Sequence, residues 1–361
     1  MNLLDDLAKI KKIDTAGVLE SIDSFTDQCL QALAETQKLN LLNIAGKIDN
    51  IVVAGMGGSA FTPEIVKTLF SQEILVPYEI IREYHLPGFV NKRTLVIISS
   101  YSGTTKEAIS CCLEALGKGS LVYAICCANQ QSELYQLVKV KGIDSYIFKE
   151  KFNPCRQPRL GGGYLICGHI GLLLRSGLID SNFDNIKKAV ISSAEKNQFN
   201  IGISFLENPA KQLAKKISGK FPILIASEFL QGAIHGFANQ LNETAKTNSA
   251  FHFIPEFNHH RLDGLEFPQE FKETGIFVFY PSDLYDKRNL IRYQITQEVV
   301  KKNGYKYCEY KPTGKDKIVQ IFETIIFNSY VSFYLAILHN KNPLKIPWVD
   351  YFKAEMAKRG Y

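Results

Sequence analysis

The sequence predicts an α/β protein with two doubly wound parallel sheets, and three observations support this prediction. β-branched apolar runs alternate with stretches whose apolar residues recur at helical spacing, which is typical of parallel sheets covered by helices. The Pro- and Gly-rich stretch 151–164 interrupts this alternation, which restarts after residue 205. The chain has 361 residues, more than a single hydrophobic core usually holds, so we expect two domains.

The first half begins with a helical lead-in over about residues 15–45, and its elements then follow in order. We expect strands at 50–58 (with its turn), 78–84, 94–100, 120–127 and 145–150. We expect helices at about 59–70, from about 105, and over 131–140. These elements assign residues 1–155 to an N-terminal domain.

The second half starts with a helical stretch over 164–178 and repeats the alternation. We expect strands at 221–227, 275–281 and 305–310, and helices at 230–246, from about 284, and over 316–339. Residues 156–361 are therefore expected to form a second domain with C-terminal helices. The similar order of elements favours a structural repeat, although no repeat is visible in the sequence.

Composition excludes several classes of protein. The net charge of +6 comes without a dense Lys/Arg tract, so nucleic acid is not expected as a partner, whereas a small anionic substrate is compatible. The early acidic residues of the N-terminus argue against a secretory signal, and no run approaches the roughly 18 apolar residues of a membrane helix. We expect a cytoplasmic protein without a membrane partner.

The eight cysteines include two adjacent pairs, Cys111–Cys112 and Cys126–Cys127, and no CxxC motif. Adjacent pairs do not indicate a disulfide framework, and the missing CxxC argues against structural zinc. We therefore expect reduced cysteines and no metal site.

The stretch "SSYSGTT" (99–105) places several hydroxyl side chains between a strand and a helix. One interpretation is simple helix capping, because Ser and Thr are good N-caps. The other is an anion site, because several donors would converge on the positive end of a helix dipole. Both interpretations remain open at this stage.

A glycine-rich loop, "GMGGSAF" (55–61), follows the first strand and precedes the hydroxyl-rich loop in the chain. Its Gly55, Gly57 and Ala60 fit the loose dinucleotide fingerprint GxGxxA, so an NAD(P) oxidoreductase is an alternative, with Glu79 or Glu83 on the ribose. A P-loop is excluded because no GK[ST] follows. Successive βα loops open on the same sheet edge, so the two loops would line one crevice suited to a phosphate monoester.

Together, "GMGGSAF" and "SSYSGTT" resemble the two signature loops of the sugar isomerase (SIS) domain. The stretches "NQLNETAK" (239–246) and "HFIPEFNHHRLDGL" (252–265) resemble the catalytic segments of the bifunctional phosphoglucose/phosphomannose isomerases. "PRLGGGY" (158–164) and the tail 331–356 resemble that family's hinge and C-terminal helices. The resemblance covers nearly the whole chain. It implies two flavodoxin-like SIS domains, usually assembled as a dimer, and no cofactor.

The resemblance also implies site residues. The phosphate would be bound by Gly57, Gly58, Ser59, Ser100, Ser102 and Thr105. The catalytic positions would be the active-site Arg159, the base Glu243, the ring-opening His259, supplied by the partner subunit, and Lys353. The sequence departs from the family at Thr104 and His260, where Asn is common, and in the glycine-rich "LGGGY". These departures bear on fine specificity.

The implied reaction interconverts glucose 6-phosphate, and also mannose 6-phosphate, with fructose 6-phosphate through a cis-enediolate. A His suits sugar-ring opening because its pKa lies near neutrality. A carboxylate such as Glu243, with its pKa raised by burial, would move the proton between C2 and C1, and Arg159 would stabilise the enediolate charge. Taken singly, Glu243 could be a solvated helix residue and His259 a loop histidine. The other alternative is a non-catalytic SIS sensor of sugar phosphates, and Glu243 and His259 in matching context argue against it.

Overall fold

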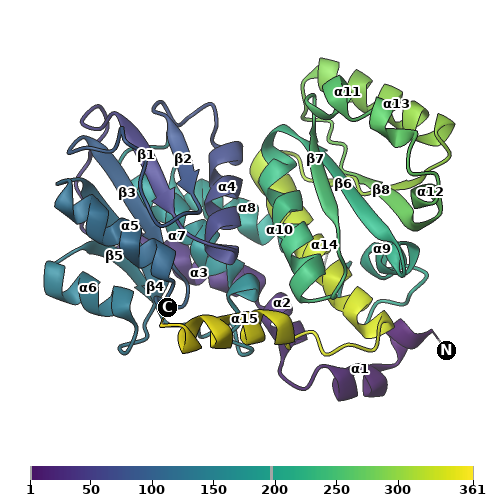
Figure 1. The fold of residues 1–361 in the computed structure, drawn as a ribbon, viewed down its shortest axis with the longest axis horizontal. Helices are drawn as coiled ribbons and strands as arrows, with labels where there is room; N and C mark the ends of the chain where they lie inside the picture. Colours follow the sequence, from purple (N-terminus) through teal and green to yellow (C-terminus); the bar gives the residue numbers. More distant parts are fainter. Residues whose placement is uncertain (1, 196–197, 361) are drawn as a thin grey trace.

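The computed structural model describes residues 2–195 and 198–360 and contains two parallel β-sheets flanked by helices (Figure 1). The first sheet has the strand order β2-β1-β3-β4-β5, and the second has the order β7-β6-β8-β9. Every strand pair is parallel. Counted within each half, both sheets begin 2-1-3-4, the flavodoxin-like order rather than the 3-2-1-4-5-6 order of dinucleotide-binding folds. The predicted fold class is confirmed, and the two halves share one topology.

The strands of the two sheets lie close to the predicted positions, with one omission. The first sheet contains β1 (Asn50–Ala54), β2 (Tyr78–Ile81), β3 (Thr94–Ser99), β4 (Leu121–Cys127) and β5 (Asp144–Phe148). The second contains β6 (Phe221–Ser227), β7 (Ala250–Ile254), β8 (Gly275–Phe279) and β9 (Lys306–Glu309). Sequence analysis missed β7. This edge strand is only partly buried at four of its five positions, so it lacks the continuous apolar run that marks the central strands.

Fifteen α-helices surround the sheets in the described residues. The first half and the connection contain α1 (Leu7–Ile13), α2 (Val18–Asp23), α3 (Phe25–Thr36), α4 (Gly58–Leu69), α5 (Lys106–Gly117), α6 (Glu133–Lys141), α7 (Gly162–Arg175) and α8 (Phe183–Ala194). The second half contains α9 (Pro209–Ile217), α10 (Gln231–Glu243), α11 (Phe257–His260), α12 (Phe271–Thr274), α13 (Lys287–Lys302), α14 (Lys317–Leu338) and α15 (Pro347–Lys358). The predicted extension of the lead-in helix to residue 45 is wrong, because α3 ends at Thr36 and a turn with a positive φ at Gly46 follows.

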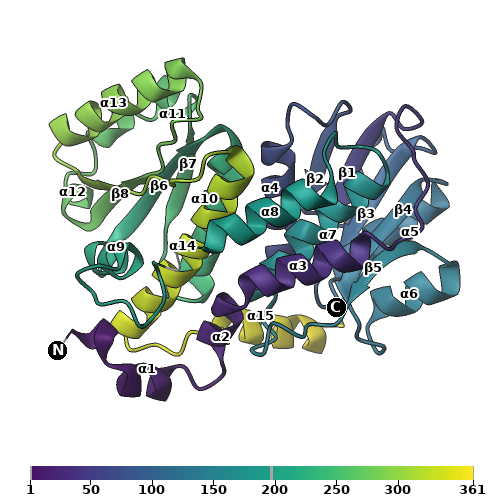
Figure 2. The same ribbon diagram turned by 180° about the vertical axis from the view of Figure 1, so that it is seen from behind.

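Helices cover both faces of the first sheet. Figure 2 shows α3, α7 and α8 on one side of it, and α3 packs directly against α7. On the other side, Cys111 and Cys112 of α5 and Leu134 and Val138 of α6 pack against the strands in a separate apolar cluster. The sheet is therefore buried on both faces, as a parallel sheet requires.

The two halves meet where α4 packs against α10. A Cβ at Gly232 of α10 would lie 2.6 Å from the backbone nitrogen of Ile65 in α4, so this close crossing requires glycine. Beyond the predicted domain boundary at residues 155–156, α7 still contacts β4 and β5 of the first sheet. The division into residues 1–155 and 156–361 stays a prediction.

The long helix α14 forms the apolar centre of the second half. By length and composition it is the one described helix that could cross a membrane, although 83% of its apolar window is buried inside the protein. The expectation that no stretch reaches this composition is therefore wrong for α14. Its burial against α9, α8 and α10 is that of a core helix. All eight cysteines are free, and seven of them are buried.

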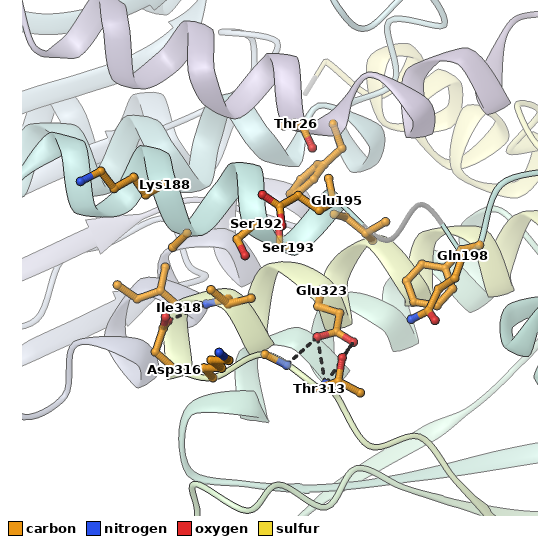
Figure 3. A pocket seen from close by; sticks show the side chains of 18 of the residues that line it. Thr26, Lys188, Ser192, Ser193, Glu195, Gln198, Thr313, Asp316, Ile318 and Glu323 are labelled. Carbon is orange, nitrogen blue, oxygen red and sulfur yellow. Dashed lines mark hydrogen bonds between the residues drawn. The ribbon is translucent and has the colours of Figure 1, made fainter.

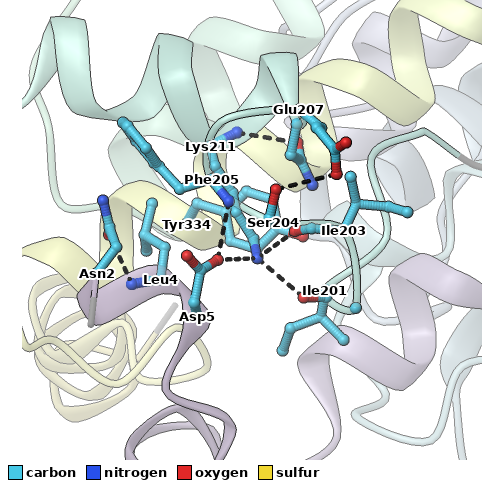
Figure 4. A network of polar contacts seen from close by, with 12 residues as sticks. Asn2, Leu4, Asp5, Ile201, Ile203, Ser204, Phe205, Glu207, Lys211 and Tyr334 are labelled. Atoms are coloured by element: carbon cyan, nitrogen blue, oxygen red, sulfur yellow. Dashed lines mark hydrogen bonds and ion pairs between the residues drawn. The ribbon is translucent and has the colours of Figure 1, made fainter.

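An ion pair between a buried lysine and a partly exposed aspartate joins the N-terminal segment to the second half (Figure 4). The fully buried Lys211 Nζ donates to Asp5 Oδ1 (2.8 Å) and to the carbonyls of Ile201 (2.9 Å) and Ile203 (2.7 Å). The Phe205 N–H also donates to Asp5 Oδ1, at 3.0 Å. Burial alone would raise the pKa of Asp5, but these donors and the Lys211 charge lower it on balance. Each of the three N–H donors of the Lys211 ammonium has an acceptor, which offsets the free-energy cost of burying its charge.

Candidate active site

The two glycine- and hydroxyl-rich loops meet at one edge of the first sheet, as predicted. The first loop (55–61) follows β1 and the second loop (99–105) follows β3, and these two strands are neighbours in the sheet. The backbone N–H of Tyr101, in the second loop, donates to the buried Ser59 Oγ of the first at 3.0 Å. Ser59 therefore joins the two loops, and of their Ser and Thr side chains those of Ser102 and Thr104 line a cleft at this edge.

The hydroxyls of the second loop bond to one another rather than to the helix. Ser100 Oγ donates to Thr105 Oγ1 at 2.9 Å, and Ser102 Oγ is hydrogen-bonded to Thr104 Oγ1 at 2.9 Å. Thr105 is the N-cap of α5, yet no described side chain caps the first turn of that helix. The same holds for α4, which begins after Gly57. The capping interpretation is therefore not realised, and the N-termini of both helices are available to an anion.

Arg159 and Glu243, which are 84 residues apart in sequence, form an ion pair. Arg159 is buried and donates all five of its N–H groups. The acceptors are Thr244 Oγ1 (from Nε, 3.1 Å), Gln157 Oε1 and Glu243 Oε2 (from Nη1, 2.9 and 3.3 Å), and the carbonyls of Pro343 and Leu344 (from Nη2, 2.8 Å each). Burial lowers the pKa of Arg159, and the Glu243 carboxylate opposes this shift. The guanidinium is thus fixed in orientation by five partners.

The Arg159–Glu243 pair lies beside the first loop. A Cβ at Gly58 would lie 3.5 Å from the Pro158 carbonyl oxygen and 3.7 Å from the Arg159 backbone nitrogen. The Glu243 side chain keeps 33% of its surface exposed. The burial that the sequence prediction invoked for this base is therefore incomplete in the single chain.

A cleft of about 880 Å³ opens next to this pair. Two predicted site residues, Ser102 and Lys353, line it, together with Gln157 and Leu344, which contact Arg159. Its charged lining consists of Lys149, Arg156, Lys345 and Lys353 against Glu150 and Asp350. The excess of cations favours an anionic ligand.

Tyr101 connects the second loop to the hinge, a role that sequence analysis missed. Its hydroxyl donates to Glu150 Oε2 at 2.7 Å and accepts from Asn153 Nδ2 at 2.7 Å. Its ring lies so close to Gly161 that a Cβ there would come within 2.2 Å. Burial raises the pKa of Tyr101, so the phenol stays protonated. The only sequence signal was a large aromatic within a loop of small residues.

His259 lies elsewhere. It is exposed on α11, which lies at the top of the second half in Figures 1 and 2, whereas α15 lies at the bottom, below the junction of the two halves. The single chain therefore does not bring His259 to the cleft that Lys353 lines. Its supply by a partner subunit stays a prediction.

A further cleft of about 760 Å³ lies between α8 and the start of α14 (Figure 3). None of the predicted site residues lines it. The Glu323 carboxylate accepts from the backbone N–H groups of Thr313 and Gly314 at 3.0 Å each. This internal carboxylate already occupies the backbone donors that an external anion would use, so we do not take this cleft as the active site.

Comparison with known proteins agrees with the geometry. Residues 206–356 match the family model described as "Bacterial phospho-glucose isomerase C-terminal SIS domain". A bifunctional phosphoglucose/phosphomannose isomerase from Caldicellulosiruptor bescii is 28% identical over 345 residues, which cover 94% of this chain and 99% of that protein. This chain is a relative of the bifunctional phosphoglucose/phosphomannose isomerases.

Other relatives of this group extend the finding. The Thermoplasma acidophilum bifunctional phosphoglucose/phosphomannose isomerase is 28% identical over 314 residues, covering 86% of this chain and 91% of that protein. A solved hypothetical protein from Thermus thermophilus has a TM-score of 0.72 at 14% identity and covers 94% of this chain and 90% of that chain, which shows the fold alone. The resemblance inferred from the sequence is confirmed, and these relatives support an isomerase enzyme.

Proposed function

We propose that this chain is an aldose–ketose isomerase that converts both glucose 6-phosphate and mannose 6-phosphate to fructose 6-phosphate. The observation that carries the proposal is the Arg159–Glu243 ion pair beside two uncapped helix N-termini. A base, a fixed cation and an anion-binding crevice are the parts that this reaction needs. The relatives named bifunctional phosphoglucose/phosphomannose isomerase support the same substrates.

The phosphate would be held by the two loops. Backbone N–H groups at the starts of α4 and α5, after Gly57 and around Thr105, point their dipoles at an anion. The phosphate would also accept hydrogen bonds from the loop hydroxyls and from the Gly58 backbone. The hydroxyls in question are those of Ser59, Ser100, Ser102 and Thr105. Lys353, which lines the cleft on α15, adds a positive charge near Ser102.

The chemical step would run between Glu243 and Arg159. The Glu243 carboxylate removes the proton from C2, and the C1 carbonyl oxygen becomes the charged oxygen of an enediolate. The O2 hydroxyl proton then moves to O1, and Glu243 returns its proton to C1 as the C2 carbonyl forms. The Arg159 guanidinium, held by its other partners, stabilises the enediolate oxygens. C2 is planar in this intermediate, so the two aldoses, which differ only at C2, give the same enediolate.

Ring opening would need a second copy of the chain. His259 is exposed on α11, distant from this chain's own α15, and is therefore accessible to another subunit. We propose a homodimer in which each His259 enters the partner's cleft and shields Glu243 from water. We also propose that the protein acts in the cytoplasm and needs no metal or cofactor. Its chain would consist of two SIS domains that divide near residue 155.

The test is to incubate the purified protein, with a chelator present, with each aldose phosphate and to assay fructose 6-phosphate. We expect both substrates to be converted and both activities to be lost in Glu243→Gln. Glu298→Gln, which removes an exposed carboxylate of α13, is the matched control and should retain full activity.

Three other outcomes are informative. Conversion of glucose 6-phosphate alone would reduce the chain to a single-substrate isomerase. Saturable binding of the sugar phosphates without any fructose 6-phosphate would favour the sensor alternative. Full turnover in Glu243→Gln would remove Glu243 from the mechanism.

A further inference from the structure

A lysine that the sequence analysis left without a role holds the end of the helix that carries Glu243. Lys246 Nζ donates to the carbonyl of Glu243 (2.9 Å), the last residue of α10, and to the carbonyl of Thr244 (3.1 Å), its C-cap. It also donates to the Asn342 carbonyl at 2.8 Å. The ammonium therefore ties the C-terminus of α10 to the segment between α14 and α15.

The same segment holds Arg159. Pro343 and Leu344 follow Asn342 in the chain. Their carbonyl oxygens accept the two Nη2 hydrogen bonds of the Arg159 guanidinium at 2.8 Å each. Arg159 in turn contacts the Glu243 carboxylate at 3.3 Å. The contacts form a closed circuit that runs from Glu243 through Lys246, the 342–344 segment and Arg159 back to Glu243.

We infer that Lys246 is a positioning residue: it sets the separation and orientation of the Arg159–Glu243 pair by clamping α10 to the 342–344 segment. This inference rests on the proposed function, because it gives Lys246 a role in the geometry of that reaction. Lys246 acts through the two catalytic groups. None of its three hydrogen bonds involves their side chains.

The backbone of Lys246 supports a dedicated role. Its φ of 55° lies in the left-handed region, which a residue with a Cβ rarely adopts. Much of the side chain is exposed while its ammonium is enclosed by three carbonyls, so packing of the aliphatic stem does not explain this conformation. The left-handed turn brings the side chain back to the end of α10, where two of its three acceptors lie, and within reach of the third, the Asn342 carbonyl.

The clamp has a pH-dependent component. The charged groups that face Lys246 are Glu243, the last residue of α10, and Arg159 from the hinge, and the nearby His339 ring bonds the Ala245 carbonyl at 3.1 Å. Desolvation and the Arg159 charge lower the pKa of Lys246 to about 8, against the opposing effect of Glu243. A neutral amine keeps only two N–H donors for three carbonyls, so the clamp loosens as the pH rises above this value.

The experiment compares wild type, Lys246→Met and Lys246→Arg as full-length proteins, with Lys301→Met, an exposed lysine of α13, as the control. We expect kcat of Lys246→Met to fall by roughly 10- to 100-fold with KM within about threefold, because a misplacement of about 1 Å has an effect of this size. Lys246→Arg should recover kcat to within about fivefold, because it retains a permanently charged donor.

The pH profile separates positioning from a general structural role. Wild-type kcat should fall above a pKa of about 8. In Lys246→Arg this alkaline limb should disappear, because arginine stays charged throughout that range. If Lys246 had only a general structural role, Lys246→Arg would lower kcat at every pH and would leave the alkaline fall of kcat at the same pH as in wild type.

Two results would overturn the inference. One is Lys246→Met with wild-type kcat. The other is an identical alkaline limb in wild type and Lys246→Arg, a comparison that does not depend on whether Lys246→Met folds. Failure of the proposed function gives a different result, because wild type itself would then produce no fructose 6-phosphate.

Discussion

Replacing Arg159 with lysine should weaken both stability and activity, and the structure sets the size of the effect. The guanidinium donates all five of its N–H groups, whereas a lysine ammonium has three, all on one atom. At least two acceptors therefore lose their donor. At about 1.5 kcal/mol for each hydrogen bond from a charged group, Arg159→Lys should lower the free energy of unfolding by about 3 kcal/mol.

This change corresponds to a measurable shift in melting temperature. At roughly 2 cal/mol/K per residue, unfolding of a chain of this length has an entropy near 0.8 kcal/mol/K, so Tm should fall by about 4 °C. The assay is thermal unfolding followed by calorimetry, with the isomerase rate measured on the same samples. We expect kcat to fall at least about tenfold, because an ammonium, whose donors all lie on one atom, cannot reproduce the planar fork that holds the guanidinium against Glu243.

The control is Arg288→Lys, which replaces a guanidinium whose side chain is 86% exposed beside Asp286. Its Tm should stay within about 1 °C of wild type, as is usual for surface substitutions. Arg159→Lys with wild-type Tm and wild-type kcat would refute the reasoning, since it would mean that the five hydrogen bonds contribute nothing that three cannot replace.

The remaining predictions address the phosphate loops, the base, the assembly and the N-terminal ion pair. The double substitution Ser102→Ala and Thr105→Ala should raise KM at least about tenfold, the effect of losing hydroxyls that bind phosphate, and an unchanged KM with a collapsed kcat would assign these hydroxyls another role. Glu243→Gln should abolish turnover while a sugar-phosphate analogue still binds with near wild-type affinity in calorimetry. Mixing Glu243→Gln and His259→Ala protomers should restore part of the activity if sites are shared, and a fully active monomer in sedimentation would contradict this. Lys211→Met should lower the free energy of unfolding by about 1–3 kcal/mol in denaturant titrations, because it removes the donor of a partly exposed carboxylate and of two carbonyls, and the two exposed lysines of the same helix serve as controls.

Local sequence determined most of the secondary structure. The apolar run of β6 begins and ends where the sequence predicts, and the long helix over 316–339 corresponds to α14 to within one residue at each end. Such elements follow from hydrophobic periodicity, which is a property of neighbouring residues. β7 was missed because a partly buried edge strand lacks that periodicity.

The sequence also located the two candidate phosphate loops, because each gathers glycine and hydroxyl residues between a strand and a helix. It left open whether the hydroxyls cap a helix or face a ligand. The structure excludes capping of α5 by Thr105, which bonds Ser100 instead, and phosphate binding by these hydroxyls stays a prediction. Competition between two partners for one hydroxyl depends on distances that no sequence pattern contains.

Only the tertiary structure assembled the site from distant segments. Arg159 meets Glu243 across 84 residues and the carbonyls of Pro343 and Leu344 across 184 and 185. Main-chain carbonyls carry no side-chain signature, so neither the five-bonded guanidinium nor the Lys246 clamp could be predicted from residue types. The sequence thus determined which elements form and which residues could carry the chemistry. The packing of α10, the hinge and the 342–344 segment decided which of those residues meet, because a hydrogen bond requires contact in space rather than proximity in the chain.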